Sequence, residues 1–80
     1  MTRYSEIKEI IVTVLALDEE VVVPEAHLQD DLGADSLALL NLAEAFEKRY
    51  GIEIPSDDLV DIANVGELVK LVESKISSQS

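Results

Sequence analysis

One serine stands where an acidic turn of the sequence meets the start of a predicted helix. Ser36 follows the segment 30–35 (DDLGAD), in which Gly33 permits a turn and Asp35 can cap a helix. The apolar pattern after the serine meets no helix breaker before Gly51. We therefore expect Ser36 at the first helical position, exposed, where free backbone N–H groups and the positive end of the helix dipole favour a bound phosphate. The sequence predicts a site for attaching an anionic group.

Serine catalysis is the first alternative for this residue. A nucleophilic serine needs a base within hydrogen-bond reach and donors for a developing oxyanion. The only histidine, His27, would have to fold back onto Ser36, and Asp35 is adjacent to the serine instead of lying behind the imidazole. The pattern disfavours a hydrolase, and we predict no catalytic residues.

Metal binding is the second alternative, because carboxylates are dense around the serine. An EF-hand loop that began at Asp30 would have Gly33 at its fourth position instead of its sixth, and Asn41 in place of the bidentate glutamate. We therefore predict no dedicated metal site. Weak binding of divalent cations by two acid clusters stays open beside the alternative of solvated faces. These clusters are Asp30, Asp35 and Glu47, and Glu53, Asp57 and Asp58.

The charge of the chain is strongly negative and unevenly placed. The 80 residues carry a net charge of −11, and no Lys or Arg occurs from Glu9 to Glu47, where ten acids fall. Such a field repels nucleic acid and anionic lipid and attracts basic protein surfaces, although solubility alone would also explain it. We expect protein partners with basic patches, no nucleic acid and no membrane.

Length and composition predict one domain, residues 1–80. The chain is too short for a second core, and without cysteine neither disulfides nor thiolate metal sites can hold it together. No apolar run approaches the ~18 residues of a membrane span, and the N-terminus shows no secretion signal. We expect a monomer in the cytoplasm.

The periodicity of apolar residues predicts three longer helices and one short helix. They cover about 3–17, 36–50, 57–62 and 65–76, with Ser56 as N-cap of the third, Asn64 and Glu67 forming a capping box for the fourth, and a frayed polar tail over 77–80. The triplet 21–23 is β-branched but has no partner strand, so we predict a long ordered loop over 18–35. In that loop, Val21 or Val23 together with Leu28 and Leu32 would reach the core. The expected fold is an all-α, up-and-down four-helix bundle.

The segment 30–37 (DDLGADSL) resembles the attachment motif of the acyl carrier proteins, and the segment 46–55 (FEKRYGIEIP) is similar to the exit of their second helix. The resemblance implies that Ser36 carries 4′-phosphopantetheine, with Asp35 and Leu37 beside it, attached by a phosphopantetheinyl transferase. The arm would hold acyl groups for acyl-transferring and condensing enzymes. The resemblance also implies a docking surface made of Asp31, Asp35, Leu37, Leu40, Asn41, Glu44 and Glu47. It implies an acyl pocket lined by Leu39, Leu42, Ala43, Phe46, Leu59 and Ile62.

Three positions depart from the pattern of bacterial fatty-acid carriers. Ala38 and Asn41 stand where acids are usual, and Glu44 occupies a position that is commonly apolar. These changes favour a specialised acyl, polyketide or aminoacyl pathway over primary fatty-acid synthesis. Two other functions stay open: a peptidyl or aminoacyl carrier of a nonribosomal pathway, and an acidic helical interaction domain without a prosthetic group.

Overall fold

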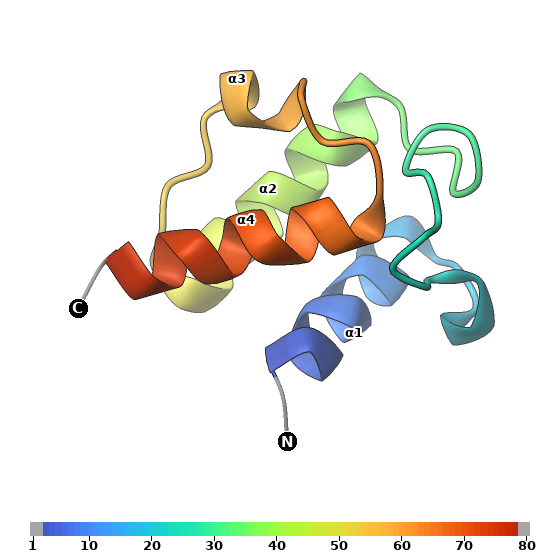
Figure 1. The fold of residues 1–80 in the computed structure, drawn as a ribbon, viewed down its shortest axis with the longest axis horizontal. Helices are drawn as coiled ribbons and strands as arrows, with labels where there is room; N and C mark the ends of the chain where they lie inside the picture. The colour runs from blue at the N-terminus through green and yellow to red at the C-terminus, as the bar shows by residue number, and fades with distance from the viewer. Residues whose placement is uncertain (1–2, 79–80) are drawn as a thin grey trace.

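The computed structural model describes residues 3–78, and the regular secondary structure in this range consists of helices joined by loops (Figure 1). The helices are α1 (Arg3–Leu15), the 3₁₀ helix η1 (Glu19–Val21), α2 (Ser36–Tyr50), α3 (Ser56–Leu59) and α4 (Val65–Ser78). The described residues form no strand, and the single β-bridge joins His27 to Asn64. The predicted all-α bundle with three longer helices and a short one is confirmed.

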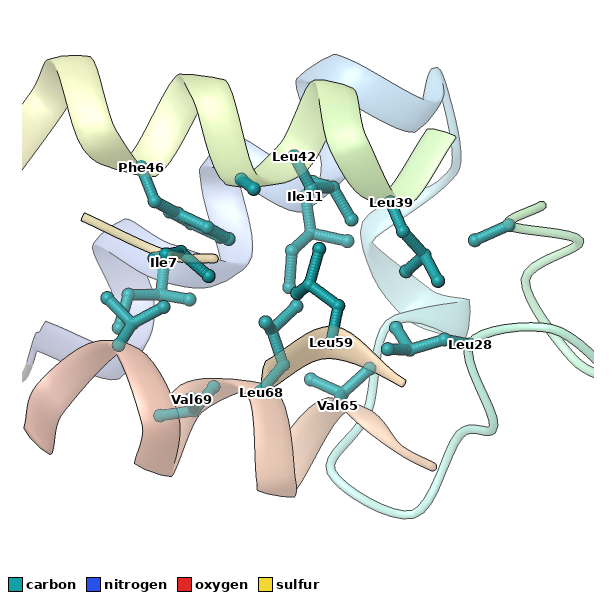
Figure 2. Close-up of a cluster of buried hydrophobic side chains, with 14 of the residues drawn as sticks. Ile7, Ile11, Leu28, Leu39, Leu42, Phe46, Leu59, Val65, Leu68 and Val69 are labelled. Carbon is teal, nitrogen blue, oxygen red and sulfur yellow. The ribbon is translucent and has the colours of Figure 1, made fainter. Parts of the chain in front are cut away.

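One apolar core joins all four α-helices. Figure 2 shows Ile7 and Ile11 of α1, Leu42 and Phe46 of α2 and Leu68 of α4 converging between the helices. Each of these five side chains is 1% exposed or less. The apolar stripe that each helix shows in sequence is the face that it buries. No helix among residues 3–78 is long and apolar enough to cross a membrane.

The helices do not all alternate in direction. The start of α1 lies beside the end of α2, where the Tyr50 hydroxyl donates a hydrogen bond to Glu6 Oε1 at 3.1 Å. Burial, and then the bond to Glu6, raises the pKa of Tyr50 above its ordinary value of 10.0. The segment 51–64 crosses back along the bundle, so that α4 runs in the same direction as α2 (Figure 1). Strict up-and-down order therefore holds for α1 and α2 but not for α4.

The first helix ends two residues earlier than predicted, at Leu15 instead of Leu17. Ala16 adopts a left-handed conformation with φ +55°, and the Leu17 N–H donates to the Val12 carbonyl at 3.1 Å. This pairing is the Schellman arrangement, in which glycine is the usual residue at the left-handed position. The helix therefore ends before the acids at 18–20 begin.

The loop between α1 and α2 buries a different valine from the two that we predicted. Val22 is fully buried, whereas Val21 and Val23 are 46% and 39% exposed. The 3₁₀ turn η1 is the reason, because it rotates the chain so that the residue after it faces inward. Leu28 and Leu32 are buried as predicted.

The two last helices differ from prediction at their ends. The short α3 covers Ser56–Leu59 instead of 57–62; Pro55 occupies its N-cap, and Ser56 is its first residue. Asn64 Oδ1 accepts the Glu67 N–H at 2.9 Å, and Glu67 Oε1 accepts the Ala63 N–H at 2.7 Å, which confirms the capping box in a form shifted by one residue. The helix α4 continues to Ser78, so residues 77–78 of the predicted tail are helical, and residues 79–80 lie outside the described range.

Candidate functional site

Ser36 is the first residue of α2, and its side chain is exposed. The preceding residue, Asp35, is the N-cap: its backbone is extended, and its Oδ1 accepts the Ala38 N–H at 2.9 Å. The first regular helical bond runs from the Leu39 N–H to the Asp35 carbonyl at 2.9 Å. The amide groups at the first helical residues have no partner within the helix, so they and the helix dipole create a positive potential beside the serine.

Hydrogen bonds within the segment itself hold the turn before Ser36 in place. The Asp31 carboxylate accepts the His27 N–H at 2.8 Å, and the Ala34 N–H donates to the Leu28 carbonyl at 2.8 Å. Leu28 and Ala34 are buried, and Gly33, which lies between them in the chain, adopts the left-handed φ of +67°. The buried residues on one side and the cap on the other hold the serine outward.

A groove lies beside Ser36, between α2 and α3. It has a volume of about 260 Å³. Its lining residues are Gln29, Ser36, Leu39, Leu40, Ser56, Leu59 and Val60. The serine hydroxyl therefore lies at the edge of a mostly apolar channel that could receive part of a flexible arm.

Two of the six predicted pocket residues, Leu39 and Leu59, line this groove. Leu42 and Phe46 are buried in the main core (Figure 2). Ala43 is buried as well, and Ile62 is half-buried at a neighbouring depression beside His27. The groove thus meets the core at its Leu39 and Leu59 end. A guest chain that reached Leu42 or Phe46 would have to displace packed side chains.

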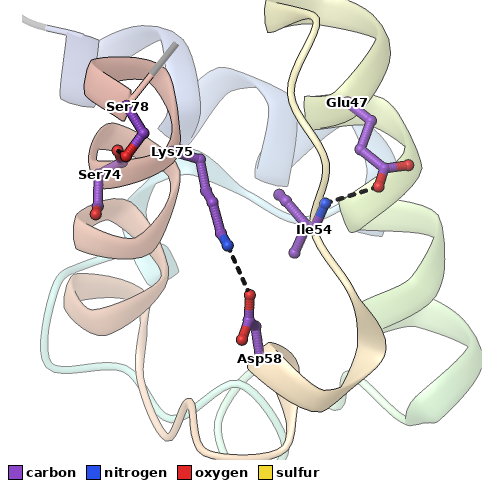
Figure 3. Close-up of polar contacts among 6 residues, drawn as sticks. All are labelled: Glu47, Ile54, Asp58, Ser74, Lys75 and Ser78. Carbon is purple, nitrogen blue, oxygen red and sulfur yellow. Dashed lines mark hydrogen bonds and ion pairs between the residues drawn. The ribbon is translucent and has the colours of Figure 1, made fainter.

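Six of the seven predicted docking residues are exposed: Asp31, Asp35, Leu37, Leu40, Asn41 and Glu44. The seventh, Glu47, is partly buried, and its Oε2 accepts the Ile54 N–H at 2.8 Å (Figure 3). This bond anchors the chain just before α3, so Glu47 has a structural role that the sequence analysis missed. The sequence does carry a signal for this role. A glutamate lies one turn before the Gly51 cap, and the loop after Gly51 returns past that glutamate.

Sequence reasoning also missed Val60, which is 77% exposed at the rim of the groove. The residue lies between Leu59, which is buried, and Asp61, which is exposed. Val60 directly follows Leu59, the one residue of the short α3 that points into the core. Two neighbouring residues cannot both point inward, and this is the signal that could have revealed Val60 as exposed.

The other chemistries considered for this region find little geometric support. His27 lies in the loop before the serine, and the contacts of its backbone, to Asp31 and Asn64, are structural. Among residues 3–78, no three side chains of the His, Cys, Asp and Glu types are arranged to hold a metal ion. In the predicted cluster of Glu53, Asp57 and Asp58, the last residue pairs with Lys75 Nζ at 2.9 Å instead (Figure 3).

Comparison with known proteins matches residues 5–72 to the model of one family, described as the phosphopantetheine attachment site. An acyl carrier protein of Thermotoga maritima is 44% identical over 73 residues, which cover 91% of this chain and 90% of the relative. The chain belongs to the phosphopantetheine-attachment family, that of the acyl carrier proteins.

Two solved structures have the same fold. One is the acetyl form of the actinorhodin acyl carrier protein of Streptomyces coelicolor, with a TM-score of 0.82 and 25% identity, covering 100% of this chain and 95% of that one. The other is the holo acyl carrier protein of Geobacter metallireducens, with a TM-score of 0.81 and 29% identity, covering 99% and 91%. The family carries 4′-phosphopantetheine covalently. An exposed hydroxyl, a positive helix start and an adjoining groove fit that group.

Proposed function

We propose that this protein carries acyl groups as thioesters on a 4′-phosphopantetheine arm esterified to Ser36. The observation that supports the residue is its position: an exposed hydroxyl at the first residue of α2, beside a capping aspartate and at the edge of a groove. When bound, the arm supplies a thiol that forms the thioester.

We expect attachment to require a second enzyme, because among residues 3–78 no histidine or carboxylate is hydrogen-bonded to the Ser36 hydroxyl, and the adjacent Asp35 caps the helix instead. A phosphopantetheinyl transferase would supply that base together with Mg²⁺. Ser36 Oγ would form a bond to the phosphorus that bears the pantetheine of coenzyme A. Adenosine 3′,5′-bisphosphate would leave, and the serine proton would pass to the base of the transferase. The amide groups at the start of α2 would then stabilise the phosphodiester charge.

Each residue near Ser36 has a proposed task. Asp35 fixes the start of the helix, Leu37 contacts the transferase and later partners, and Leu39 and Leu59 receive the part of the arm or cargo nearest the protein. Exposed acids such as Asp31 and Glu44 attract the basic patches of acyl-transferring and condensing enzymes.

An acyl cargo is favoured over an aminoacyl one by the 44% identity to an acyl carrier protein. A specialised acyl or polyketide pathway is favoured by Ala38 and Asn41, which leave the exposed start of α2 without the usual acids. A cytoplasmic location stays a prediction.

Loading by a promiscuous phosphopantetheinyl transferase with coenzyme A and Mg²⁺ tests the attachment residue. Intact-mass measurement should show one added phosphopantetheine on the wild type and none on Ser36→Ala. Ser56→Ala is the matched control, because Ser56 is the first residue of α3 and lines the same groove, and it should load as the wild type does. A wild type that stays unmodified would favour the interaction domain without a prosthetic group.

The cargo needs a separate measurement. Mass analysis of the thioester released from protein isolated from its native host distinguishes an acyl or polyketide group from an amino acid. An amino acid on the arm would overturn the acyl assignment and leave the carrier assignment in place.

A further inference from the structure

The start of α4 lies at the same end of the bundle as the start of α2, and a loop of the protein occupies its amide groups (Figure 1). The Val65 N–H donates to the Ala26 carbonyl at 3.0 Å. The Gly66 N–H donates to the Pro24 carbonyl, also at 3.0 Å. The first amide groups of a helix have no partner within it, so the loop supplies the acceptors that α4 lacks.

Two further contacts join the same segments in an antiparallel arrangement. The Leu28 N–H donates to the Ala63 carbonyl at 3.0 Å. His27 forms the single β-bridge of the described chain with Asn64. The approach is close, because a Cβ added to Gly66 would lie 3.3 Å from the Pro24 oxygen. We call the paired segments, 24–28 and 63–66, the loop clasp.

The loop clasp is bonded directly to the turn that carries Ser36. Leu28, whose N–H is bound by Ala63, accepts the Ala34 N–H at its own carbonyl at 2.8 Å. Ala34 is buried and precedes Asp35, the cap of α2, which is followed by the serine. A continuous path of hydrogen bonds therefore leads from the start of α4 to the serine turn.

His27 attaches the same turn to the loop clasp at a second point. Its N–H donates to Asp31 Oδ2 at 2.8 Å. Its carbonyl accepts the Asp31 N–H at 2.9 Å and the Leu32 N–H at 3.1 Å. In the part of the chain that the structure describes, all hydrogen bonds of residues 31–34 go to His27 and Leu28. The position of the turn thus depends on the loop clasp.

Asn64 fixes the α4 side of the loop clasp. Its Oδ1 accepts the Glu67 N–H, the third amide of α4, at 2.9 Å, and Glu67 Oε1 accepts the Ala63 N–H at 2.7 Å. Both backbone groups of Ala63 are therefore bound, the N–H by Glu67 and the carbonyl by Leu28. Loss of the Asn64 side chain would leave an amide of α4 without its acceptor and loosen the backbone that holds the loop.

We propose that Asn64 is a positioning residue for the modification of Ser36 and acts through the loop clasp. The loop clasp holds the turn over 31–34, and the turn determines where the serine hydroxyl lies when a transferase binds. Group transfer depends steeply on the placement of the reacting atoms. A loosened loop clasp should therefore slow the transfer step and leave the binding of the transferase unchanged. The inference rests on the proposed attachment at Ser36.

Three variants test this role in transfer of phosphopantetheine from coenzyme A by a promiscuous transferase. The measurement is the maximal single-turnover rate, together with the transferase concentration that gives half of it. Asn64→Ala should lower the maximal rate about fivefold and keep the half-saturating concentration within about twofold of the wild type. Asn64→Ser retains a capping oxygen and should restore most of the rate. Tyr50→Phe also removes one hydrogen bond, but at the far end of α2, and should keep the wild-type rate.

Hydrogen exchange of the unmodified carrier follows the path itself. The exchange rate of the Ala34 amide is compared with the rates of amides in the middle of α2. This ratio should rise about fivefold in Asn64→Ala and keep its wild-type value in Tyr50→Phe, because only the first variant opens the loop clasp locally.

The proposal is overturned if Asn64→Ala reaches the wild-type maximal rate, or if only its half-saturating concentration changes, since Asn64 would then affect docking. Equal losses of rate in Asn64→Ala and Tyr50→Phe would overturn it too, because general stability would be the cause. A wild type that stays unmodified would instead refute the attachment at Ser36. Thermal melting verifies that each variant is folded in the assay. Asn64→Gly, which destabilises a helix start less than alanine does, replaces Asn64→Ala if that variant melts.

Discussion

The groove beside Ser36 has two walls, α2 and α3, which are held in place by very different means. The helix α2 has 15 residues, a capping side chain at its start and a left-handed glycine, Gly51, at its end. It buries four side chains in the core: Leu39, Leu42, Ala43 and Phe46. The helix α3 has four residues, no side-chain cap and one buried residue, Leu59. Tertiary contacts, not local helix stability, must therefore hold the second wall.

Few contacts tie α3 to the rest of the molecule. Its Leu59 reaches the core, and Asp58 pairs with Lys75 of α4 (Figure 3). The described backbone hydrogen bonds of residues 55–62 stay within that segment, from Asp58 to Pro55 and from Ile62 to Leu59. One wall of the groove is thus fixed by many core contacts and the other by few, so we expect α3 to open locally more readily than α2.

The largest effect is expected from Phe46→Ala, which removes the largest fully buried side chain of α2. Lost burial and the resulting cavity should reduce the free energy of unfolding by about 4 kcal/mol. An 80-residue domain has little stability to spare, so urea denaturation followed by circular dichroism should find the variant largely unfolded at room temperature. A loss below about 2 kcal/mol would mean that α2 is not the fixed wall.

Leu59→Ala comes next, at about 2 kcal/mol, because its site in a four-residue helix can collapse after truncation. Hydrogen exchange should show the amide of Ile62 losing protection while amides in the middle of α2 keep theirs. Equal loss of protection in both helices would show that the two walls unfold together and that α3 is not the less stable of the two.

Asp35→Ala removes the cap of α2 and should lower the free energy of unfolding by about 1 kcal/mol. Asp57→Ala is the matched control, since Asp57 lies in the first turn of α3 and makes no capping bond, and its cost should not exceed about 0.5 kcal/mol. Thermal melting of the two variants provides the comparison. Equal costs would indicate that simple charge, not the cap, stabilises the start of α2.

Tyr50→Phe breaks the bond from the end of α2 to Glu6 and should also cost about 1 kcal/mol near neutral pH. The pKa of Tyr50 is raised in the folded chain, so the stability that this hydroxyl contributes is complete below pH 10 and is lost as the pH rises through the raised value. The difference between wild type and variant should therefore shrink in denaturation curves above pH 10. A difference that stays constant there would exclude the tyrosine as its source.

The smallest effect is expected from Lys75→Met, which breaks the partly exposed pair with Asp58. Less than about 1 kcal/mol should be lost, seen as faster exchange of the Ile62 amide by up to about fivefold. High salt should bring the exchange rate of the Ile62 amide in the wild type close to that in the variant, because salt screens the ion pair. Lys70→Met, at an exposed position of the same helix, should leave the exchange unchanged.

The contrast between the walls also explains which features the sequence could predict. The helix over 36–50, its Asp35 cap and its Gly51 terminus were all predicted, because local side-chain bonds and glycine conformation determine them. The bounds of α3 were not, since a helix so short depends on what it packs against. Val22 was missed because a 3₁₀ turn changes which valine faces inward.

The serine site likewise combines features that the local sequence predicts with features that depend on tertiary structure. Local pattern was enough to predict an exposed Ser36 at the start of a helix. The groove depends on how α3 returns over α2, and Ser56 and Val60 join its lining although neither has a periodic signal of its own. The partial burial of Glu47 likewise follows from the path of the chain near Ile54, which is a tertiary feature.

Two carboxylates of the neighbouring helices hold the ends of the α3 segment by hydrogen bonds. Glu47 of α2 accepts the Ile54 N–H, and Glu67 of α4 accepts the Ala63 N–H. Because both bonds hold main-chain amides, they do not depend on which side chains lie between them. The exposed positions of residues 56–61 can therefore vary, while the two anchored ends and the buried Leu59 keep the remaining scaffold as it is.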